Sequence, residues 1–255
     1  METSIVTFNI RYIYDGEDEI NNFIHRAGLI YKKISAEKPD IIGLQEVTVP
    51  ILDLFEKMFP EYLVVGNFKN ADCTGGGVFV AVKKDKYQIL GFETRWLSDT
   101  PFVPGSCYEK LSHVPKSFIM TMVRHKESGK AFRVYNAHLD HLSDEARILG
   151  IKSIFELADE MNENYSLPYV LMGDFNSTPD SEVVKFCDSR QDIADVTKNI
   201  EITFNGFGKR KEKKLDYIYV SKEFNDAVVD VSVWDDKENG IWLSDHYPVC
   251  VKINI

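Results

Sequence analysis

Two kinds of hydrophobic spacing alternate along the sequence, and this alternation restricts the fold more than any other feature. Residues 5–8 and 41–44 are short apolar or β-branched runs, which are typical of buried strands. Between them, apolar residues recur at the spacing of one helical face. These are Phe23, Ala27, Ile30 and Ile34. Pro39 is expected to end this helix, because proline lacks the amide donor that a helix needs. The first part of the chain is therefore predicted as strand, helix and strand.

The same alternation continues to the end of the 255-residue chain. Further strands are predicted at residues 78–82, 132–135, 169–172, 217–220 and 249–253. A second helix is predicted from Ser143, a suitable capping residue, to about residue 162. Its apolar stripe consists of Ile151, Ile154, Phe155, Ala158 and Met161. Since the sequence has neither an internal repeat nor a linker-like segment, we expect one α/β domain over residues 1–255, with helices flanking two packed sheets.

Composition and charge exclude several classes of protein. Hydrophobic residues make up 44% of the chain and charged residues 27%, which is typical of a globular protein with a large core. The net charge of −10 disfavours long duplex DNA as a substrate, because proteins that grip a duplex usually carry a basic face. The four cysteines are far apart and form no C-x-x-C pair, which argues against a zinc knuckle and gives little support for a disulfide scaffold.

The sequence also gives expectations about location. Its start lacks a basic segment followed by an apolar stretch of signal-peptide length, and nowhere do about 18 apolar residues follow one another. We therefore expect a cytoplasmic protein without a transmembrane segment, or a secreted one if a leader has been removed. We expect it to be a monomer.

Polar and acidic residues occur at the ends of the predicted strands. They are Asn9, Glu46, Asp174, Asn176, Asp216, Asp245 and His246. A strand end can hold a carboxylate in a fixed position beside solvent and substrate, whereas a strand interior must be apolar to build the core. The alternative is that these residues simply end strands, since Asp and Asn are common turn formers.

The sequence contexts of these residues favour the functional interpretation. They are Phe8-Asn9, Leu44-Gln45-Glu46, Asn136-Ala137-His138-Leu139, Gly173-Asp174-Phe175-Asn176, Leu215-Asp216-Tyr217-Ile218 and Ser244-Asp245-His246-Tyr247-Pro248. In this order they resemble the motifs of the endonuclease/exonuclease/phosphatase superfamily, over residues 4–253. Residues 95–105 also look like a segment typical of a bacterial branch related to the nocturnin and deadenylase group. The resemblance implies the deoxyribonuclease I-like fold, a four-layer α/β sandwich of two packed, mainly antiparallel sheets flanked by helices.

The resemblance also implies a metal site. Glu46 would be the principal metal ligand, with Asn9 and Asp245 nearby and reaching the ion through water. Carboxylates that converge at one edge repel one another unless a cation lies among them. Because oxygen ligands favour Mg²⁺ or Mn²⁺ over zinc, the implied cofactor is Mg²⁺, with Mn²⁺ as the alternative.

The remaining motif residues would carry the catalytic steps. By resemblance, Asp174 and Asn176 orient the attacking water, and His246 binds the scissile phosphate or acts as the base. Asp216 would fix the tautomer and orientation of His246. The sequence leaves open which residue takes the proton. His138 occupies the position where family members carry a histidine or tyrosine that assists the leaving group.

Several further residues carry weaker expectations. Asp140 and Arg147 are expected either to support His138 or to form a structural ion pair, and Trp242 either to bind substrate or to lie in the core. The basic run at residues 209–214 is interpreted as a solvated hairpin tip that could also attract phosphate. Residues 113–118 depart from the bacterial branch, where an aromatic residue and an arginine would precede the next strand.

The predicted function is a Mg²⁺-dependent phosphodiesterase, exonuclease or phosphatase. Its expected partner is a phosphate-ester substrate, either RNA or another single-stranded nucleic acid, or a small phosphorylated metabolite. Two alternatives remain open at this point. One is a secreted, sphingomyelinase-like lipid phosphodiesterase, for which residues 102–103 are the candidate membrane contact. The other is a catalytically silent binding module with the same fold.

Overall fold

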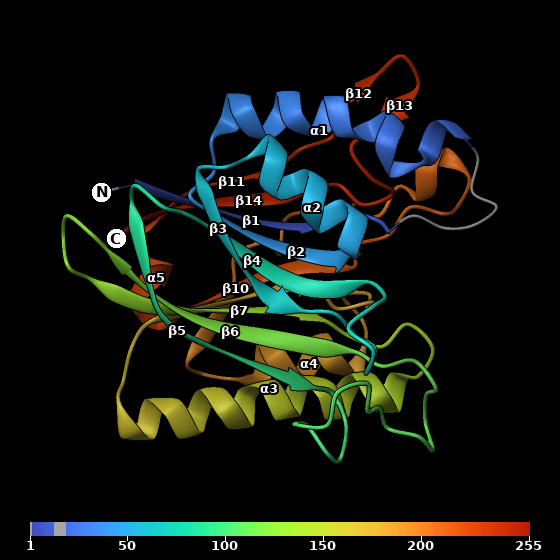
Figure 1. The fold of residues 1–255 in the computed structure, drawn as a ribbon. Helices are drawn as coiled ribbons and strands as arrows, with labels where there is room; N and C mark the ends of the chain where they lie inside the picture. The colour runs from blue at the N-terminus through green and yellow to red at the C-terminus, as the bar shows by residue number, and fades with distance from the viewer. Residues whose placement is uncertain (1, 13–18) are drawn as a thin grey trace.

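Two six-stranded sheets pack face to face in the computed structural model, which describes residues 2–12 and 19–255 (Figure 1). The first sheet has the order β11 (Val228–Val233), β14 (Val249–Asn254), β1 (Glu2–Asn9), β2 (Ile41–Val47), β4 (Gly77–Lys83) and β3 (Tyr62–Asn67). The second has the order β5 (Tyr87–Trp96), β6 (Ser117–His125), β7 (Ala131–His138), β8 (Tyr169–Asp174), β10 (Asp216–Ser221) and β9 (Ile193–Asp195). Each sheet contains one parallel pair, β1–β2 or β7–β8, and its other pairs are antiparallel. The prediction of two mainly antiparallel sheets is confirmed.

Helices cover the outer face of each sheet (Figure 1). On the first sheet lie α1 (Phe23–Glu37) and α2 (Val49–Met58), and on the second lie α3 (Asp144–Asn164) and α4 (Glu182–Ser189). The remaining elements are short. They are α5 (Lys222–Asn225), the 3₁₀ turns η1 (Glu19–Asn21) and η2 (Gly206–Gly208), and the ribbon of β12 (Lys237–Glu238) and β13 (Ile241–Trp242). No helix among the described residues is both long enough and apolar enough to cross a bilayer.

Alternating side chains of the central strands hold the four layers together. In β8, Val170 and Met172 pack between the two sheets, whereas Tyr169 and Leu171 pack against the helix layer of α3 and α4. This is the two-residue period of a strand that is buried on both faces. Burial of each such aliphatic side chain stabilises the fold by about 1.5–3 kcal/mol. The apolar runs read from the sequence therefore form the centre of the molecule.

The long helix α3 begins and packs as its sequence predicts. The Ser143 hydroxyl accepts a hydrogen bond from the Ala146 amide at 3.1 Å, and this cap fixes the first turn. Four members of the predicted apolar stripe are buried and Met161 is partly buried. The prediction for the helix end, at about residue 162, agrees with Asn164 to within two residues.

The strand ends that carry the polar motifs meet at one edge of the double sheet. β1 and β2 are parallel, so their carboxyl ends lie together, and Asn9 is opposite Gln45. In the second sheet Asp216 at the start of β10 pairs with Asp174 at the end of β8, because these strands are antiparallel. The segment with Asp245 and His246 leads into β14, which is antiparallel to β1. Residues from both sheets are thus brought to one place.

Candidate active site

Glu46 is aimed into the site by an irregularity in β2. The pairing of β2 with β4 shifts register between Gln45 and Val47, and Glu46 itself has a φ of 63°. An extra residue of this kind redirects the side chain away from the regular alternation, and bulges are frequent next to active sites. A Cβ on Gly76 would lie 3.1 Å from Glu46 Cα, so glycine allows the neighbouring turn to approach this closely.

Asn9 joins the two sheets across the site. Its Nδ2 donates to Glu46 Oε1 at 3.2 Å and to Asp174 Oδ2 at 2.9 Å, while its Oδ1 accepts from the Arg11 amide at 3.0 Å. Asn9 is buried and belongs to the first sheet, whereas Asp174 belongs to the second. The predicted metal ligand and the predicted catalytic carboxylate are therefore both hydrogen-bonded to one amide.

Glu46 and Asp245 both lie beside the guanidinium group of Arg11. Arg11 Nη1 lies 3.9 Å from Glu46 Oε2, and Arg11 Nε lies 3.6 Å from Asp245 Oδ2. Burial alone would raise the pKa of Glu46, but the charges of Arg11 and Lys116 and hydrogen bonds from the Tyr12 amide and Asn9 lower it instead. Glu46 is therefore ionised at neutral pH. The carboxylate oxygens of Glu46 and Asp245 lie close to a positive charge, and ligands of this kind suit a hard divalent cation.

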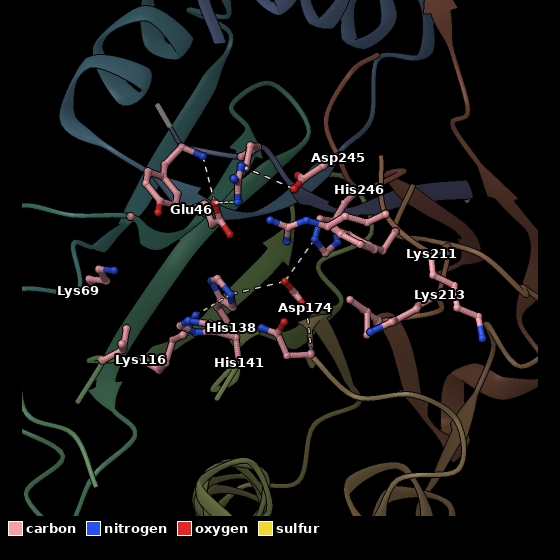
Figure 2. Close-up of a pocket in the computed structure, with 18 residues that line it drawn as sticks. Glu46, Lys69, Lys116, His138, His141, Asp174, Lys211, Lys213, Asp245 and His246 are labelled. Carbon is pink, nitrogen blue, oxygen red and sulfur yellow. Dashed lines mark hydrogen bonds and ion pairs between the residues drawn. The ribbon is translucent and has the colours of Figure 1, made fainter. Parts of the chain in front are cut away.

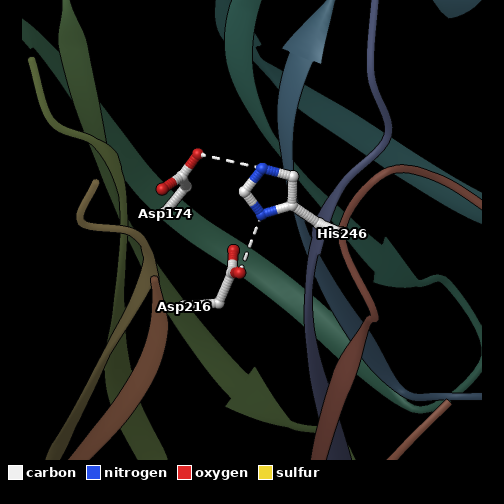
Figure 3. Close-up of side chains that lie close together, drawn as sticks. All are labelled: Asp174, Asp216 and His246. Carbon is white, nitrogen blue, oxygen red and sulfur yellow. Dashed lines mark hydrogen bonds and ion pairs between the residues drawn. The ribbon is translucent and has the colours of Figure 1, made fainter. Parts of the chain in front are cut away.

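His246 lies between two carboxylates (Figure 3). Its Nδ1 is 2.8 Å from Asp216 Oδ2, and its Nε2 is 3.8 Å from Asp174 Oδ2. Burial opposes the charge of the ring, yet Asp216 and Asp174 outweigh it and raise the pKa of His246 to about 10. The three side chains form the one tight group of acidic, histidine or cysteine ligand atoms found among the described residues. Both ring nitrogens already face a carboxylate, which fits an ion-paired imidazolium.

Asp174 is the centre of the arrangement. Its Oδ1 accepts a hydrogen bond from the Asn176 amide at 2.8 Å, and the Asn176 side chain donates to the Leu139 carbonyl at 3.1 Å. Burial and the Asp216 charge raise the pKa of Asp174 to about 6, although His246 and the Asn176 amide act in the opposite direction. A buried carboxylate with a raised pKa is suited to accepting a proton near neutral pH.

His138 lies on another side of Asp174 and contacts a lysine. Its Nε2 is 3.5 Å from Asp174 Oδ2 and 2.8 Å from Lys116 Nζ. Burial, followed by the Lys116 and His246 charges, holds the pKa of His138 well below its usual value. His138 is therefore neutral at pH 7. It carries no imidazolium proton for the leaving-group role that the resemblance suggests.

These groups line one pocket of about 430 Å³ (Figure 2). Of the predicted site residues, Glu46, His138, Asp174, Asn176, Asp245 and His246 line it, and Asn9 and Asp216 bond to lining residues from behind. The pocket has basic side chains that the sequence interpretation did not assign to the site. They are Arg11, Lys69, Lys116 and His141. Three members of the basic run, Arg210, Lys211 and Lys213, also line it, so this segment is more than a solvated tip.

Three weaker candidates lie outside the pocket lining. Asp140 accepts hydrogen bonds from the Ser112 hydroxyl and from the two backbone amides just before α3, and Arg147 donates to the Asp140 carbonyl. Trp242 stacks under the Lys237 ammonium and lies near Gly208. These contacts hold loops and a helix start in place around the site.

The comparisons with known proteins agree with this fold and site. The sequence profile of the Endonuclease/Exonuclease/phosphatase family matches residues 6–246. The chain therefore belongs to this family, whose members are phosphoric ester hydrolases and typically use a divalent metal. A search of curated proteins finds no match.

Several solved structures superpose over almost the whole chain. An endonuclease/exonuclease/phosphatase from Bacteroides vulgatus has 25% identity and a TM-score of 0.89, with 100% of this chain and 99% of that chain covered. A mannosyl-6-phosphatase from Bacteroides thetaiotaomicron has 23% identity and a TM-score of 0.88, with 99% and 100% covered. The human nocturnin catalytic domain with a bound sulfate anion has 19% identity and a TM-score of 0.75, with 99% and 94% covered. The last two comparisons establish similarity of fold.

Proposed function

We propose that this protein is a Mg²⁺-dependent hydrolase of phosphate esters that acts in the pocket around Asp174. The observation that carries the proposal is the position of Asp174, which is bonded to Asn9 and flanked by His138 and His246. The same pocket holds Glu46 and Asp245. A phosphoryl transition state needs positive charge, a positioned water and a partner for the leaving oxygen, and this pocket offers groups for each.

Glu46, Asp245 and Asn9 are the residues that would hold the cation, with Mn²⁺ as an alternative to Mg²⁺. All three offer oxygen atoms, and their place beside Arg11 supports a role in binding positive charge. Stabilisation of the negative charge on the phosphoryl oxygens is the chemistry that a bound cation supplies here.

The protein's own side chains divide the proton movements between them. Asp174 takes the proton of the attacking water, because its carboxylate is buried and its pKa is raised to about 6. Asn176 fixes Asp174 by its amide and orients the water. His246 cannot serve as the base while it is protonated. Its Nδ1 is hydrogen-bonded to Asp216, whereas its Nε2 is 3.8 Å from Asp174 Oδ2 and is the nitrogen that donates a hydrogen bond to a phosphoryl oxygen.

A small phosphorylated metabolite is the substrate class that we favour. The pocket is about 430 Å³ and is lined by basic side chains, whereas the whole chain has a net charge of −10. The local charge attracts a phosphate group, while the overall charge repels a long polyanion. RNA or another single-stranded nucleic acid is the second candidate.

A panel of phosphate esters tests the proposal. Sugar phosphates, inositol phosphates, single-stranded RNA, DNA and sphingomyelin are assayed with Mg²⁺, with Mn²⁺ and with EDTA. We expect EDTA-sensitive hydrolysis of at least one sugar phosphate, and a loss of about 10²–10⁴-fold in Asp174→Asn and His246→Ala. Parent-like rates of both variants on every ester would rule out this site as the catalytic centre. An inert parent that binds no Mg²⁺ would support the silent binding module instead.

One observation favours the lipid alternative. Phe102 and Val103 are adjacent and are 67% and 52% exposed, as a membrane-inserting tip would be. The Phe102 ring also stacks with the Arg95 guanidinium at 5.0 Å, which gives it a structural contact. Co-sedimentation with sphingomyelin vesicles separates the two roles, since an inserting tip gives binding that Phe102→Ser abolishes.

A further inference from the structure

Lys116 is the most deeply buried lysine of the pocket lining, and the proposed function has given it no task. It is 7% exposed and stands just before β6. Its carbonyl accepts a hydrogen bond from the Leu97 amide at 2.8 Å, which fixes the backbone. Burial of a lysine without a carboxylate partner is costly, so a position of this kind needs a reason.

The partner of Lys116 is a histidine. Its Nζ lies 2.8 Å from His138 Nε2, and none of the ion pairs within 4 Å found in the described part of the chain includes Lys116. An ammonium carries three donors and no acceptor, so Lys116 donates and His138 Nε2 accepts. The nitrogen of His138 that faces Asp174 is therefore already occupied by a Lys116 proton. It has no proton of its own to give to a leaving oxygen.

Two donor hydrogens remain on the Lys116 ammonium beside the pocket. Figure 2 places Lys116 next to His138, on the opposite side of Asp174 from Lys211 and Lys213. The Lys116 ammonium is thus hydrogen-bonded to His138, and His138 in turn lies beside Asp174. His138 therefore holds the ammonium near Asp174.

We propose that Lys116 is the catalytic residue that protonates the leaving oxygen, and that His138 is a positioning residue that holds the Lys116 ammonium. This inference rests on the proposed function. The water oxygen forms a new P–O bond, and the P–O bond to the alcohol breaks with its electron pair on the leaving oxygen. That oxygen takes a proton from Lys116 Nζ, and Asp174 takes the proton that the water loses. After the alcohol has left, solvent returns the proton from Asp174 to Lys116, so the charges balance.

The electrostatics of Lys116 are compatible with this role. Burial lowers the pKa of Lys116 to about 8, even though Glu46 and Asp174 act in the opposite direction. At neutral pH the group is protonated and yet a stronger acid than an exposed lysine, as a general acid should be.

Dependence on the leaving group distinguishes Lys116 from His138. The leaving group of an ethyl ester is a strongly basic alkoxide that needs a proton, whereas the leaving group of a 4-nitrophenyl ester is a stable phenolate. The parent, Lys116→Met, Lys116→Arg and His138→Gln are assayed on ethyl and 4-nitrophenyl phosphate and on the matching diesters. We expect Lys116→Met to lose about 10²–10⁴-fold in kcat/KM on the ethyl ester and less than about tenfold on the 4-nitrophenyl ester. His138→Gln should show a smaller loss with the same leaving-group preference.

Two further variants keep the outcome clear. Lys116→Arg retains the charge and a long side chain but is a far weaker acid, so it should show the same selective loss even if Lys116→Met folds poorly. Lys69→Met removes another cation of the pocket, and it should affect both esters alike. Equal losses on both esters in the Lys116 variants, or a selective loss that is larger in His138→Gln, overturn the assignment. A parent inactive on all esters contradicts the proposed function and removes this role with it.

Discussion

The ring of His246 has a carboxylate at each nitrogen, and this arrangement determines its charge. Asp216 at 2.8 Å is the closer partner and the larger favourable influence on the His246 pKa. In Asp216→Asn the pKa of His246 should fall from about 10 toward its usual value of 6.5, which two-dimensional NMR of the metal-free protein can follow. Because the pKa is raised in the folded state, the stabilisation is complete below pH 6.5 and is lost as the pH rises through about 10.

The same substitution should slow hydrolysis by about 10²–10⁴-fold at pH 7, since the ring loses both its charge and its fixed orientation. Asp192→Asn is a matched control, because Asp192 is hydrogen-bonded to Tyr169 and Arg190 and none of these three residues lines the pocket. An unchanged His246 titration in Asp216→Asn would contradict the ion-pair interpretation, whatever the effect on rate.

Glu46 and Asp245 should determine metal affinity rather than folding. Isothermal titration of the metal-free protein with Mg²⁺ should give a dissociation constant at least about tenfold higher for Glu46→Gln or Asp245→Asn than for the parent. Both variants leave a side chain of the same size beside Arg11. If both bind Mg²⁺ as tightly as the parent does, the cation is held elsewhere, and the tight group around His246 becomes the next place to look.

The sequence predicted the carboxylates, Asn9 and the two histidines of the candidate site, but not Arg11 or Lys116. Asn9, Glu46 and Asp174 stand in short motifs whose context carries information, and the structure brings all three together. Arg11 and Lys116 have no such context, and a lysine or arginine is usually a surface residue. The burial of Lys116 depends on the folding of residues distant in sequence, so no local pattern could reveal it.

Glycine positions show how tightly the strands are packed at the site. Gly173 in β8 has a φ of 148°, and a Cβ there would lie 2.0 Å from the Ala137 carbonyl oxygen of β7. Gly173→Ala should therefore destabilise the protein by at least about 3 kcal/mol in urea unfolding, because neither backbone can easily move. Gly28→Ala provides the contrast. Gly28 is exposed in the middle of α1 with nothing within 4 Å of a Cβ, and alanine should stabilise that helix by about 0.5–1 kcal/mol.

Destabilisation of similar size in both variants would mean that the close approach of β7 and β8 is not what restricts Gly173. The comparison also controls for the general effect of replacing glycine, since both changes reduce the entropy of the unfolded chain by the same mechanism.

Elements with a long periodic pattern were predictable, whereas short ones and irregularities were not. The helix α3 has 21 residues, a capping serine and an apolar stripe, and its prediction is confirmed. The helices α2 and α4 have only 10 and 8 residues, and their few apolar positions do not separate a helix from a strand. The bulge that aims Glu46 arises from pairing with β4, so it depends on contacts that the sequence of β2 does not encode locally.

The site is divided between the two sheets, and this makes their relative position part of the chemistry. Glu46 and Asn9 come from the first sheet, and Asp174, Asp216 and His138 come from the second. The apolar core between the sheets sets the distance but offers little resistance to sliding, because hydrophobic contacts are not directional. A directional interaction across the interface is therefore needed to fix the position of one sheet relative to the other.

Asn136 provides that interaction. It lies in β7, is fully buried, and donates from Nδ2 to the carbonyls of Leu44 and Phe79 in the first sheet, both at 2.9 Å. Its Oδ1 accepts from Gln45 Nε2 at 2.6 Å. Asn136→Leu removes the side-chain donor to the Leu44 and Phe79 carbonyls and the shortest acceptor contact of Gln45 Nε2, and we expect a loss of about 2–5 kcal/mol in the free energy of unfolding. Since Gln45 precedes Glu46, Mg²⁺ affinity should fall as well, measured at a temperature where the variant is folded.

Asn164→Leu is the matched control, because Asn164 is exposed near the end of α3 and its side chain donates to the Glu160 carbonyl of the same helix. This variant should retain parent stability to within about 0.5 kcal/mol and unchanged Mg²⁺ binding. If Asn136→Leu were equally stable and bound Mg²⁺ like the parent, Asn136 would not be needed to set the register of the two sheets. In that case the apolar core together with the buried Asn9 amide, which donates to both Glu46 and Asp174, would be sufficient to bring these two side chains together.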